Sequence, residues 1–384
     1  MRITVVGIGY VGLSLAKILA RKHMVTCYDS NLVKLDKLDE IPLQEQKYLK
    51  NIKLNKAYTS LDAYREADLV FVCVPTNLDE SQKSLDLTNL EDVLKNIILY
   101  NSKVKVIIKS TLSMECVDLL KNYSKKLSVF YSPEFLKENT ALYDCLFPSR
   151  IVLGYLSEGD ISLAKEIVEI IKDCTEIPDV QTIITSLGNA IAIKLFSNAY
   201  LAMRLSFFNE LDSFAQIYGL NTSDIIKGVS LDSRIGDTYN HPSFGFKGYC
   251  LPKDTISLSN SFSNVPSELI PSIIQSNQKR INFAIQRICE YIKDNHCKKI
   301  GIYRLTMEKG SDNIRFSIMQ DIILGLKKQG IKIFVYEPTL ENEHMQDIEL
   351  ISFQELLECD LIITNRMYKE LDQIKDKVFT WDSL

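Results

Sequence analysis

Three glycines and one carboxylate near the amino terminus have the spacing of a phosphate cradle. Gly7, Gly9 and Gly12 form a GxGxxG motif that follows a short apolar run and opens a helical pattern. Such glycines allow a tight turn, a close backbone approach to a diphosphate and close helix–strand packing. Asp29 ends the next apolar run, where a carboxylate binds ribose hydroxyls and repels a 2′-phosphate. The motif therefore predicts that the chain binds NAD rather than NADP.

Cys250 stands where a helix is expected to begin. Pro252 suits the first turn of a helix, and the helix N-terminus together with Lys253 would lower the pKa of a thiol and favour a nucleophile. Asp254 lies four residues further on and shares the same helix face. The alternative is a small buried cysteine, our interpretation of most of the other eight, and spacing alone leaves the two balanced.

Further polar residues stand in apolar surroundings. Lys194 and Asn198 lie four residues apart in a long apolar segment, so they share a helix face and need polar partners. Their position alone favours a structural salt bridge or a snorkelling lysine. Polar residues also follow three successive predicted strands, at Pro75-Thr76, Ser110-Thr111 and Ser132–Glu138. Together they line the carboxyl edge of one sheet, where open α/β sheets bind ligands.

The elements that must position these residues alternate between short apolar runs and helical patterns. This alternation predicts βαβ units, and hence an α/β fold with two Rossmann-like, doubly wound parallel-sheet domains. A proline-free apolar segment, 187–218, predicts a long central helix that joins them through a helical middle segment. The predicted strands of the first domain are Ile3–Val6, Val25–Tyr28, Leu69–Val74, Val104–Ile108, Val129–Tyr131 and Ile151–Leu153. A second strand–helix alternation begins near residue 298.

Composition excludes several other classes of protein. The 384 residues are 46% hydrophobic and 24% charged, which is typical of a globular chain. The net charge is −4 without a basic stripe, so no nucleic-acid partner is expected. No apolar run is long enough for a membrane span. The sequence has no CxxC pair and its histidines are scattered, so no metal site is expected. Without an export signal, we expect reduced thiols and a cytoplasmic protein.

The order of these motifs resembles the nucleotide-sugar 6-dehydrogenases of the UDP-glucose/GDP-mannose dehydrogenase family, from Met1 to about residue 380. Within the family, SPEFL and GYCLPKD resemble the short bacterial UDP-glucose branch. The motifs are GIGYVG at 7–12, VPTN at 74–77, KSTL at 109–112, SPEFLKE at 132–138, PSRIVLG at 148–154, IKLFSNAYLAMRLSFFNELD at 193–212, DSRIG at 232–236, YNHPSFG at 239–245, GYCLPKDT at 248–255 and GSDNIR at 310–315.

The resemblance implies a twofold oxidation of UDP-glucose to UDP-glucuronate with two NAD⁺ and one water, in the service of polysaccharide or lipid modification. It divides the chain into an NAD-binding domain (1–186), a helical dimerisation domain with the cysteine loop (187–294) and a UDP-sugar-binding α/β domain (295–384). Cys250 forms a thiohemiacetal and then a thioester, and the partner is a second copy of the chain, with Arg234 reaching across the interface to the partner's substrate.

The resemblance also assigns residues to roles. The implied catalytic residues are Cys250, Lys194, Asn198, Asp254, Glu138 and Thr111. The implied NAD contacts are Gly7, Gly9, Tyr10, Val11, Gly12, Asp29, Lys34, Thr76, Thr111, Glu138, Lys253 and Arg315. The implied substrate contacts are Glu134, Phe135, Leu136, Lys194, Asn198, Arg234, Tyr239, Asn240, Ser243, Lys247 and Tyr249.

Two residues depart from the family pattern. Lys247 stands where the family usually has glycine, and Glu308 where it usually has lysine. Our hypothesis is a coupled change, in which Lys247 supplies the lost positive charge or pairs with Glu308; alternatively Lys309 takes the place of the lost lysine. The departures keep other substrates open, such as GDP-mannose or a UDP-N-acetylhexosamine. The alternative from another class is a non-catalytic nucleotide-sugar-binding protein.

Overall fold

The computed structural model describes residues 1–36, 38, 47–49, 52–79, 84–248, 250–263, 265–306, 317–338, 340 and 348–381. Backbone contacts divide the chain into two compact units. The first comprises Met1–Phe196 and Asn260–Asn264, and the second comprises Ser197–Ser259 and Val265–Leu384. The division into three domains expected from the sequence is a different partition and stays a prediction.

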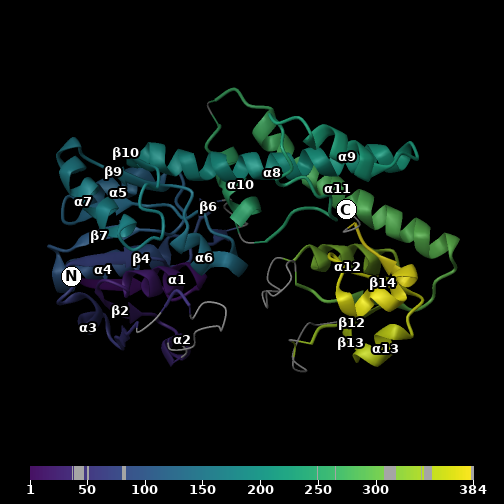
Figure 1. Cartoon of the computed structure of the whole chain (residues 1–384), viewed down its shortest axis with the longest axis horizontal. Helices are drawn as coiled ribbons and strands as arrows, with labels where there is room; N and C mark the ends of the chain where they lie inside the picture. Colours follow the sequence, from purple (N-terminus) through teal and green to yellow (C-terminus); the bar gives the residue numbers. More distant parts are fainter. Residues whose placement is uncertain are drawn as a thin grey trace. The chain divides into compact units, whose positions relative to one another are not determined.

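Eight described strands of the first unit form one sheet, in the order β10-β9-β8-β7-β4-β1-β2-β3 (Figure 1). The run from β3 to β8 has the strand order of a doubly wound dinucleotide-binding domain, which confirms the predicted fold class. The strands are β1 (Arg2–Val6), β2 (Met24–Tyr28), β3 (Leu54–Lys56), β4 (Leu69–Val72), β7 (Lys105–Ile108), β8 (Ser128–Tyr131), β9 (Ile151–Tyr155) and β10 (Thr182–Ser186). A separate antiparallel hairpin joins β5 (Leu78–Asp79) and β6 (Ser84–Leu85).

One strand pair of this sheet departs from the predicted parallel arrangement. β9 pairs antiparallel with β8, through Tyr131 and Gly154, whereas the other neighbouring strands of the sheet are parallel. The segment between them holds only short helices and does not cross the sheet, so β9 starts at the edge where β8 ends. The parallel order therefore holds through the part of the sheet that carries the predicted cradle.

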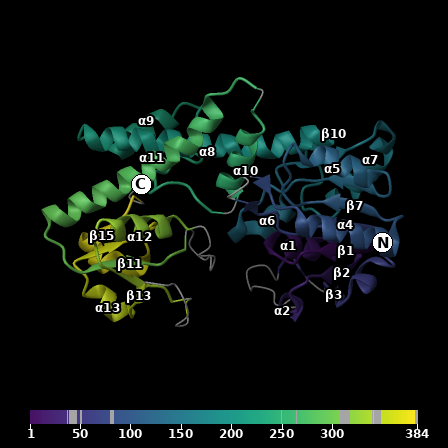
Figure 2. The same ribbon diagram turned by 180° about the vertical axis from the view of Figure 1, so that it is seen from behind.

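Helices and 3-10 turns fill the connections of the first unit. One core contains the apolar faces of α1, α6 and α7 together with strand residues such as Val5 and Phe71. Their strand neighbours, such as Val70 and Val72, point to the opposite face and are equally buried, so both faces are covered. Figure 2 shows α1 beside β1 and β2. The helices are α1 (Tyr10–Leu19), α2 (Leu32–Asp36), α3 (Ser60–Tyr64), α4 (Thr88–Asn101), α5 (Cys116–Ser124), η1 (Glu138–Thr140), α6 (Ala141–Leu146), η2 (Glu158–Asp160) and α7 (Ile161–Lys172).

The predicted long helix is α8, Leu187–Ile217, which continues from the first unit into the second without a break in Figure 1. It has no proline and only one glycine, so nothing in its sequence interrupts the backbone hydrogen bonds. Its polar residues Lys194, Asn198, Asn209 and Asp212 are buried, while several aromatic side chains are exposed. No helix in the described part of the chain has the length and apolarity of a membrane span.

The second unit contains a smaller, fully parallel sheet in the order β13-β12-β11-β14-β15. Ile300 and Ile302 pack with α11 and α12 on one face, while Tyr303 and Ile362 pack with α13 on the other. The strands are β11 (Ile300–Tyr303), β12 (Ile333–Tyr336), β13 (Glu349–Leu350), β14 (Leu361–Ile363) and β15 (Val378–Phe379). The helices are α9 (Thr222–Ser230), α10 (Cys250–Asn260), α11 (Leu269–Asp294), α12 (Ile318–Lys328), α13 (Phe353–Leu357) and η3 (Lys369–Lys377).

Candidate active site

The three glycines of the first motif are required for different reasons. Gly7 has φ +86°, and a Cβ on it would lie 2.7 Å from the Cys73 backbone. A Cβ on Gly12 would lie 2.0 Å from the Gly7 carbonyl oxygen, so the turn itself excludes one. A Cβ on Gly9 would meet nothing within 4 Å. The fold therefore requires Gly7 and Gly12, whereas the open space at Gly9 fits a diphosphate close to the backbone at the start of α1. Tyr10 and Val11 follow as the first residues of α1.

Asp29 is fixed at the end of β2 beside this turn. Its Oδ2 accepts the Ile8 N–H at 2.7 Å, and its Oδ1 accepts the Asn31 N–H at 2.8 Å. The Lys34 ammonium lies 3.3 Å from Oδ2. These bonds hold a buried carboxylate next to the glycine turn, where the ribose of a dinucleotide is expected. The residues present therefore fit NAD.

The loops after β4, β7 and β8 are joined by side chains, as expected for one sheet edge. Thr76 Oγ1 donates to the Thr111 carbonyl at 2.8 Å, and Ser110 Oγ donates to the Val74 carbonyl at 2.6 Å. Lys109 Nζ donates to Ser132 Oγ at 3.2 Å and to the Pro133 carbonyl at 3.3 Å. The predicted polar residues of three loops thus form one bonded group, in which Thr76 and Thr111 are buried. Glu138 is exposed in η1.

A buried ion pair joins α8 to the loop after β8. Lys194 Nζ lies 2.7 Å from Glu134 Oε1 and donates to the Glu134 carbonyl at 2.7 Å. Burial alone would raise the pKa of Glu134, but the Lys194 ammonium and the Leu136 N–H hold that pKa below its usual value. The structure thus brings together two predicted substrate contacts, and the salt bridge favoured by position alone is present.

The same loop lines a cavity of about 190 Å³ in the first unit. Lys109, Glu134, Phe135 and Leu136 are among its lining residues, and the Arg150 guanidinium stacks 3.7 Å from the centre of the Phe135 ring. Burial lowers the pKa of Lys109, against the opposing effects of nearby thiols and Glu134. Sequence reasoning missed Lys109 and Arg150 as site residues. The signal was available for Lys109, a charged residue that directly follows an apolar strand.

In the second unit, Asn198 Nδ2 donates to Asp254 Oδ2 at 2.5 Å. Both side chains are buried, and Asp254 is completely inaccessible. Cys250 is the first residue of α10, which also carries Lys253 and Asp254. Cys250 is half-buried, and none of the nine cysteines is in a disulfide. An asparagine, a carboxylate and a thiol at a helix start form a set that can support thiol addition to a carbonyl.

The other eight cysteines are in environments that suppress the thiolate. Burial raises the pKa of Cys27, Cys73 and Cys145 to about 12 and that of Cys174 to about 11. Burial also raises the pKa of the remaining four thiols, Cys116, Cys289, Cys297 and Cys359. These eight thiols are therefore weak nucleophiles at neutral pH.

The loop before Cys250 carries most of the other predicted substrate contacts. Arg234 is exposed and pairs with Asp232 at 2.6 Å. Tyr239 has a positive φ of 54°, and Asn240 Nδ2 donates to Ser230 Oγ at 2.9 Å. Ser243 is buried, and its hydroxyl donates to the Gly245 carbonyl at 3.1 Å. Arg234, Asn240 and Ser243 thus each have a polar partner close by in the sequence.

Lys247 forms an ion pair with Asp321 on α12, at 2.7 Å. Glu308 and Lys309 lie outside the described residues, so the proposed coupling between Lys247 and Glu308 stays a prediction. Tyr249 and Arg315, a predicted substrate contact and a predicted NAD contact, also lie outside them. The partner that Lys247 does have, Asp321, was not foreseen, because the two residues are far apart in the sequence.

A second carboxyl edge was missed by residue-level reasoning. Arg304 follows β11 with a positive φ of 62°, and the buried Glu337 follows β12 and accepts the Leu305 N–H at 2.7 Å. The buried Thr364 and Asn365 follow β14. The signal was polar residues directly after apolar strands, the same pattern that identified the first edge. Among the described residues, no cluster of His, Cys, Asp and Glu could hold a metal ion.

Comparisons with known proteins agree with this geometry. Residues 1–172 match the NAD binding domain of the UDP-glucose/GDP-mannose dehydrogenase family, and residues 188–279 match its central domain. The chain is 40% identical to a UDP-glucose 6-dehydrogenase of Campylobacter jejuni, over 100% of this chain and 98% of that protein. It is 36% identical to a UDP-glucose 6-dehydrogenase of Streptococcus pneumoniae, over 100% and 99%.

Solved structures show the same fold at lower identity. A UDP-glucose dehydrogenase from Pyrobaculum islandicum has a TM-score of 0.83 at 22% identity, covering 96% of this chain and 90% of that one. The family match and the full-length relatives define an NAD-dependent oxidoreductase. With the full-length similarity, the chain belongs to the UDP-glucose/GDP-mannose dehydrogenase family.

The glycine geometry gives a test that separates folding from cofactor binding. Gly9→Ala should leave the free energy of unfolding within about 0.5 kcal/mol of wild type, because its Cβ enters open space. The same change should weaken NAD binding by about tenfold or more, since the Cβ occupies the approach of the diphosphate. Calorimetric titration with NAD and urea unfolding measure the two effects.

Gly12→Ala is the matched comparison. Its Cβ meets the Gly7 carbonyl, so the variant should lose about 1–3 kcal/mol or more of stability. Wild-type NAD affinity in Gly9→Ala would contradict the placement of the diphosphate.

Proposed function

We propose that the chain oxidises UDP-glucose at C6 to UDP-glucuronate, using two NAD⁺ and one water for each sugar. The observation that carries the choice of sugar nucleotide is the 40% identity, over the whole chain, to a protein named UDP-glucose 6-dehydrogenase. The reaction class is supported by the NAD cradle in the first unit and by the residues Cys250, Asn198 and Asp254 in the second.

Removal of the hydroxyl proton from C6 is the first task. Asp254, held by Asn198, is a carboxylate that can orient a water as proton acceptor. Asp29 and the backbone near Gly9 would hold NAD⁺ by its ribose and diphosphate, and the bound cofactor would supply the hydride acceptor for both oxidations.

Cys250 then adds to the aldehyde and keeps it bound. Cys250 is the first residue of α10, where the helix dipole is positive. The tetrahedral thiohemiacetal carries a developing oxyanion, and Lys194 and Asn198 are the proposed donors to it. The second oxidation leaves a thioester on Cys250. Water oriented by Asp254, with Thr111 and Glu138, hydrolyses this thioester to the carboxylate and restores the thiol.

The nucleotide half of the substrate is assigned to the second unit. The carboxyl edge of its sheet presents Arg304, Glu337 and Asn365, and such edges are where α/β sheets bind ligands. Glu134, Phe135 and Leu136 are the proposed contacts to the sugar. Lys247 carries a positive charge suited to a diphosphate, and Asp321 restrains it.

The proposed assembly is a homodimer formed through α8. Tyr200, Phe207 and Phe214 are spaced by seven residues, so they lie on one helix face, and each is more than half exposed in the single chain. Exposed aromatic residues at this spacing are typical of a protein interface. Leu231, which is 76% exposed, and Ile235 flank Arg234, consistent with its proposed reach to the partner's substrate.

Product stoichiometry tests the reaction. Purified enzyme with UDP-glucose and excess NAD⁺ should release two NADH for each sugar consumed, followed at the NADH absorbance. One NADH per sugar would show that the aldehyde leaves, and none would favour a binding protein. GDP-mannose and UDP-N-acetylhexosamines serve as competing substrates, and a higher kcat/KM on either would overturn the choice of UDP-glucose.

Cys250→Ser tests the covalent step. The change removes the thiolate nucleophile, so turnover should fall on the order of a thousandfold or more. NAD affinity should stay near wild type, because the change replaces one side-chain atom and leaves the glycine turn and Asp29 untouched. Cys289→Ser, at a thiol whose pKa is raised by burial, is the control and should keep full activity. Full activity in Cys250→Ser would refute the assigned role.

Phe207→Glu tests the dimer. A charge at this 57% exposed ring should abolish self-association, because an unpaired carboxylate is costly in an apolar interface. Light scattering should give twice the 43.9 kDa chain mass for wild type and a single chain mass for the variant. Leu99→Glu, at an exposed position on α4, should remain a dimer. A dimeric Phe207→Glu would exclude this face.

A further inference from the structure

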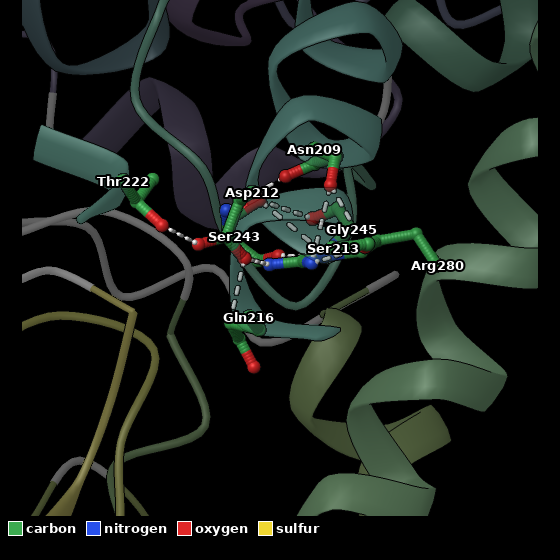
Figure 3. A network of polar contacts seen from close by, with 8 residues as sticks. All are labelled: Asn209, Asp212, Ser213, Gln216, Thr222, Ser243, Gly245 and Arg280. Carbon is green, nitrogen blue, oxygen red and sulfur yellow. Dashed lines mark hydrogen bonds and ion pairs between the residues drawn. The ribbon is translucent and has the colours of Figure 1, made fainter. Parts of the chain in front are cut away.

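The loop that leads to Cys250 is held by side chains at both backbone groups of Ser243. The Ser243 N–H donates to Asn209 Oδ1 of α8 at 2.8 Å. The Ser243 carbonyl accepts from Arg280 Nε of α11 at 2.7 Å (Figure 3). Ser243 is buried, so its backbone N–H and carbonyl cannot bond to water and are satisfied by these two side chains instead.

A second peptide of the loop is held in the same manner three residues later. The Phe246 N–H donates to Asn277 Oδ1 at 2.8 Å, and its carbonyl accepts from Asn277 Nδ2 at 2.8 Å. Gly245 lies between the two held peptides with φ +146°. Asn277 and Arg280 are three residues apart on α11, so one helix face holds both peptides.

Arg280 is itself oriented by buried partners. It is 3% exposed, its Nη2 lies 2.7 Å from Asp212 Oδ2, and its Nη1 donates to Ser213 Oγ at 2.7 Å. Gln216 Nε2 and Thr222 Oγ1 donate to the Asp212 carboxylate, as Figure 3 shows. The Asp212 carboxylate thus balances the charge of the Arg280 guanidinium, while Nε of the same group donates to the Ser243 carbonyl of the loop.

Packing alone does not require this arrangement. A buried ion pair is often replaced by apolar residues without loss of stability, so the packing of α8 on α11 could be achieved without it. What apolar residues could not do is fix two loop peptides through four hydrogen bonds. The polar residues therefore specify the course of the backbone between Ser243 and Phe246.

We propose that Asn277 and Arg280 are positioning residues that set the affinity for the sugar nucleotide by fixing the backbone of Ser243–Phe246. The inference rests on the proposed function, because Ser243 is one of the proposed substrate contacts and the loop continues to Cys250. Neither residue touches substrate or cofactor in this proposal; they act through the loop.

Arg280→Lys is the test. A lysine can still neutralise Asp212, but a single ammonium cannot also reproduce the bonds to Ser243 and Ser213. The KM for UDP-glucose should rise about tenfold or more, while the KM for NAD stays within about twofold, since the change leaves the glycine turn and Asp29 untouched. A merely structural role would lower the active fraction without changing either KM.

Gln216→Ala is the matched control. The change removes a hydrogen bond to Asp212, but Gln216 does not bond to Ser243 or Phe246 of the loop. Both KM values should therefore stay at wild type. Asn277→Ala is a second test, at a residue that is less buried than Arg280. It still tests the positioning role if Arg280→Lys does not fold. It should raise only the KM for UDP-glucose. The proposal would be overturned if Arg280→Lys and Asn277→Ala both left the KM for UDP-glucose unchanged, or if they raised the KM for UDP-glucose and the KM for NAD equally.

A readout without substrate separates this inference from the proposed reaction. Trp381 is the single tryptophan of the chain, its ring lies 4.6 Å from the Arg280 guanidinium, and Phe244 of the loop packs edge-on against it at 5.0 Å. Arg280→Lys should shift Trp381 emission to longer wavelength and speed amide exchange at Gly245 and Phe246, and Gln216→Ala should do neither. If wild type proves inactive on UDP-glucose, the proposed function fails, while unchanged emission and exchange would overturn the positioning role itself.

Discussion

The burial of polar groups along α8 is the constraint on which the rest of the structure depends. A polar side chain removed from water costs free energy unless it is bonded, so each such residue dictates a partner from another segment. Lys194 requires Glu134, Asn198 requires Asp254, and Asp212 requires Arg280. One helix thereby fixes the loop after β8 in the first unit, and α10 and α11 in the second.

These pairs are better explained by specificity than by stability. Charges taken out of water regain in attraction about what they lose in hydration, so an apolar helix would pack at least as well. Removing one partner, in contrast, leaves a buried charge alone at a cost of roughly 3–5 kcal/mol. Glu134 illustrates the balance, because burial raises its pKa, and the Lys194 ammonium together with the Leu136 N–H brings that pKa below its usual value. The Lys194 ammonium is therefore one of the groups that favour the ionised form of this buried carboxylate.

The sequence was sufficient wherever the signal is local. The apolar runs predicted β1, β2, β4 and β8, and the absence of breakers predicted α8 nearly to the residue. The GxGxxG motif, followed by Asp29, predicted the cradle because backbone geometry alone demands those residues. The polar residues after three strands could be assigned to one edge, because parallel strands end together.

What the sequence could not supply is the identity of partners far apart in the chain. Position alone favoured a salt bridge for Lys194 but named no acceptor, and Glu134 lies sixty residues away. Lys247 was expected to compensate Glu308, and its described partner is Asp321. The antiparallel β9 was missed for a related reason, since strand direction depends on whether the connection crosses the sheet and apolar patterning does not encode that.

Arg280 shows how far such long-range pairing reaches. In the sequence it is one of several basic residues in an amphipathic helix, where a solvated position is the ordinary expectation. The structure buries it among α8, the Ser243 loop and Trp381, because a guanidinium can satisfy a carboxylate, a hydroxyl and a carbonyl at once. A lysine at this position would satisfy the charge but not the geometry. The choice of arginine therefore indicates that the position of the loop backbone, and not only neutralisation of Asp212, constrains this residue.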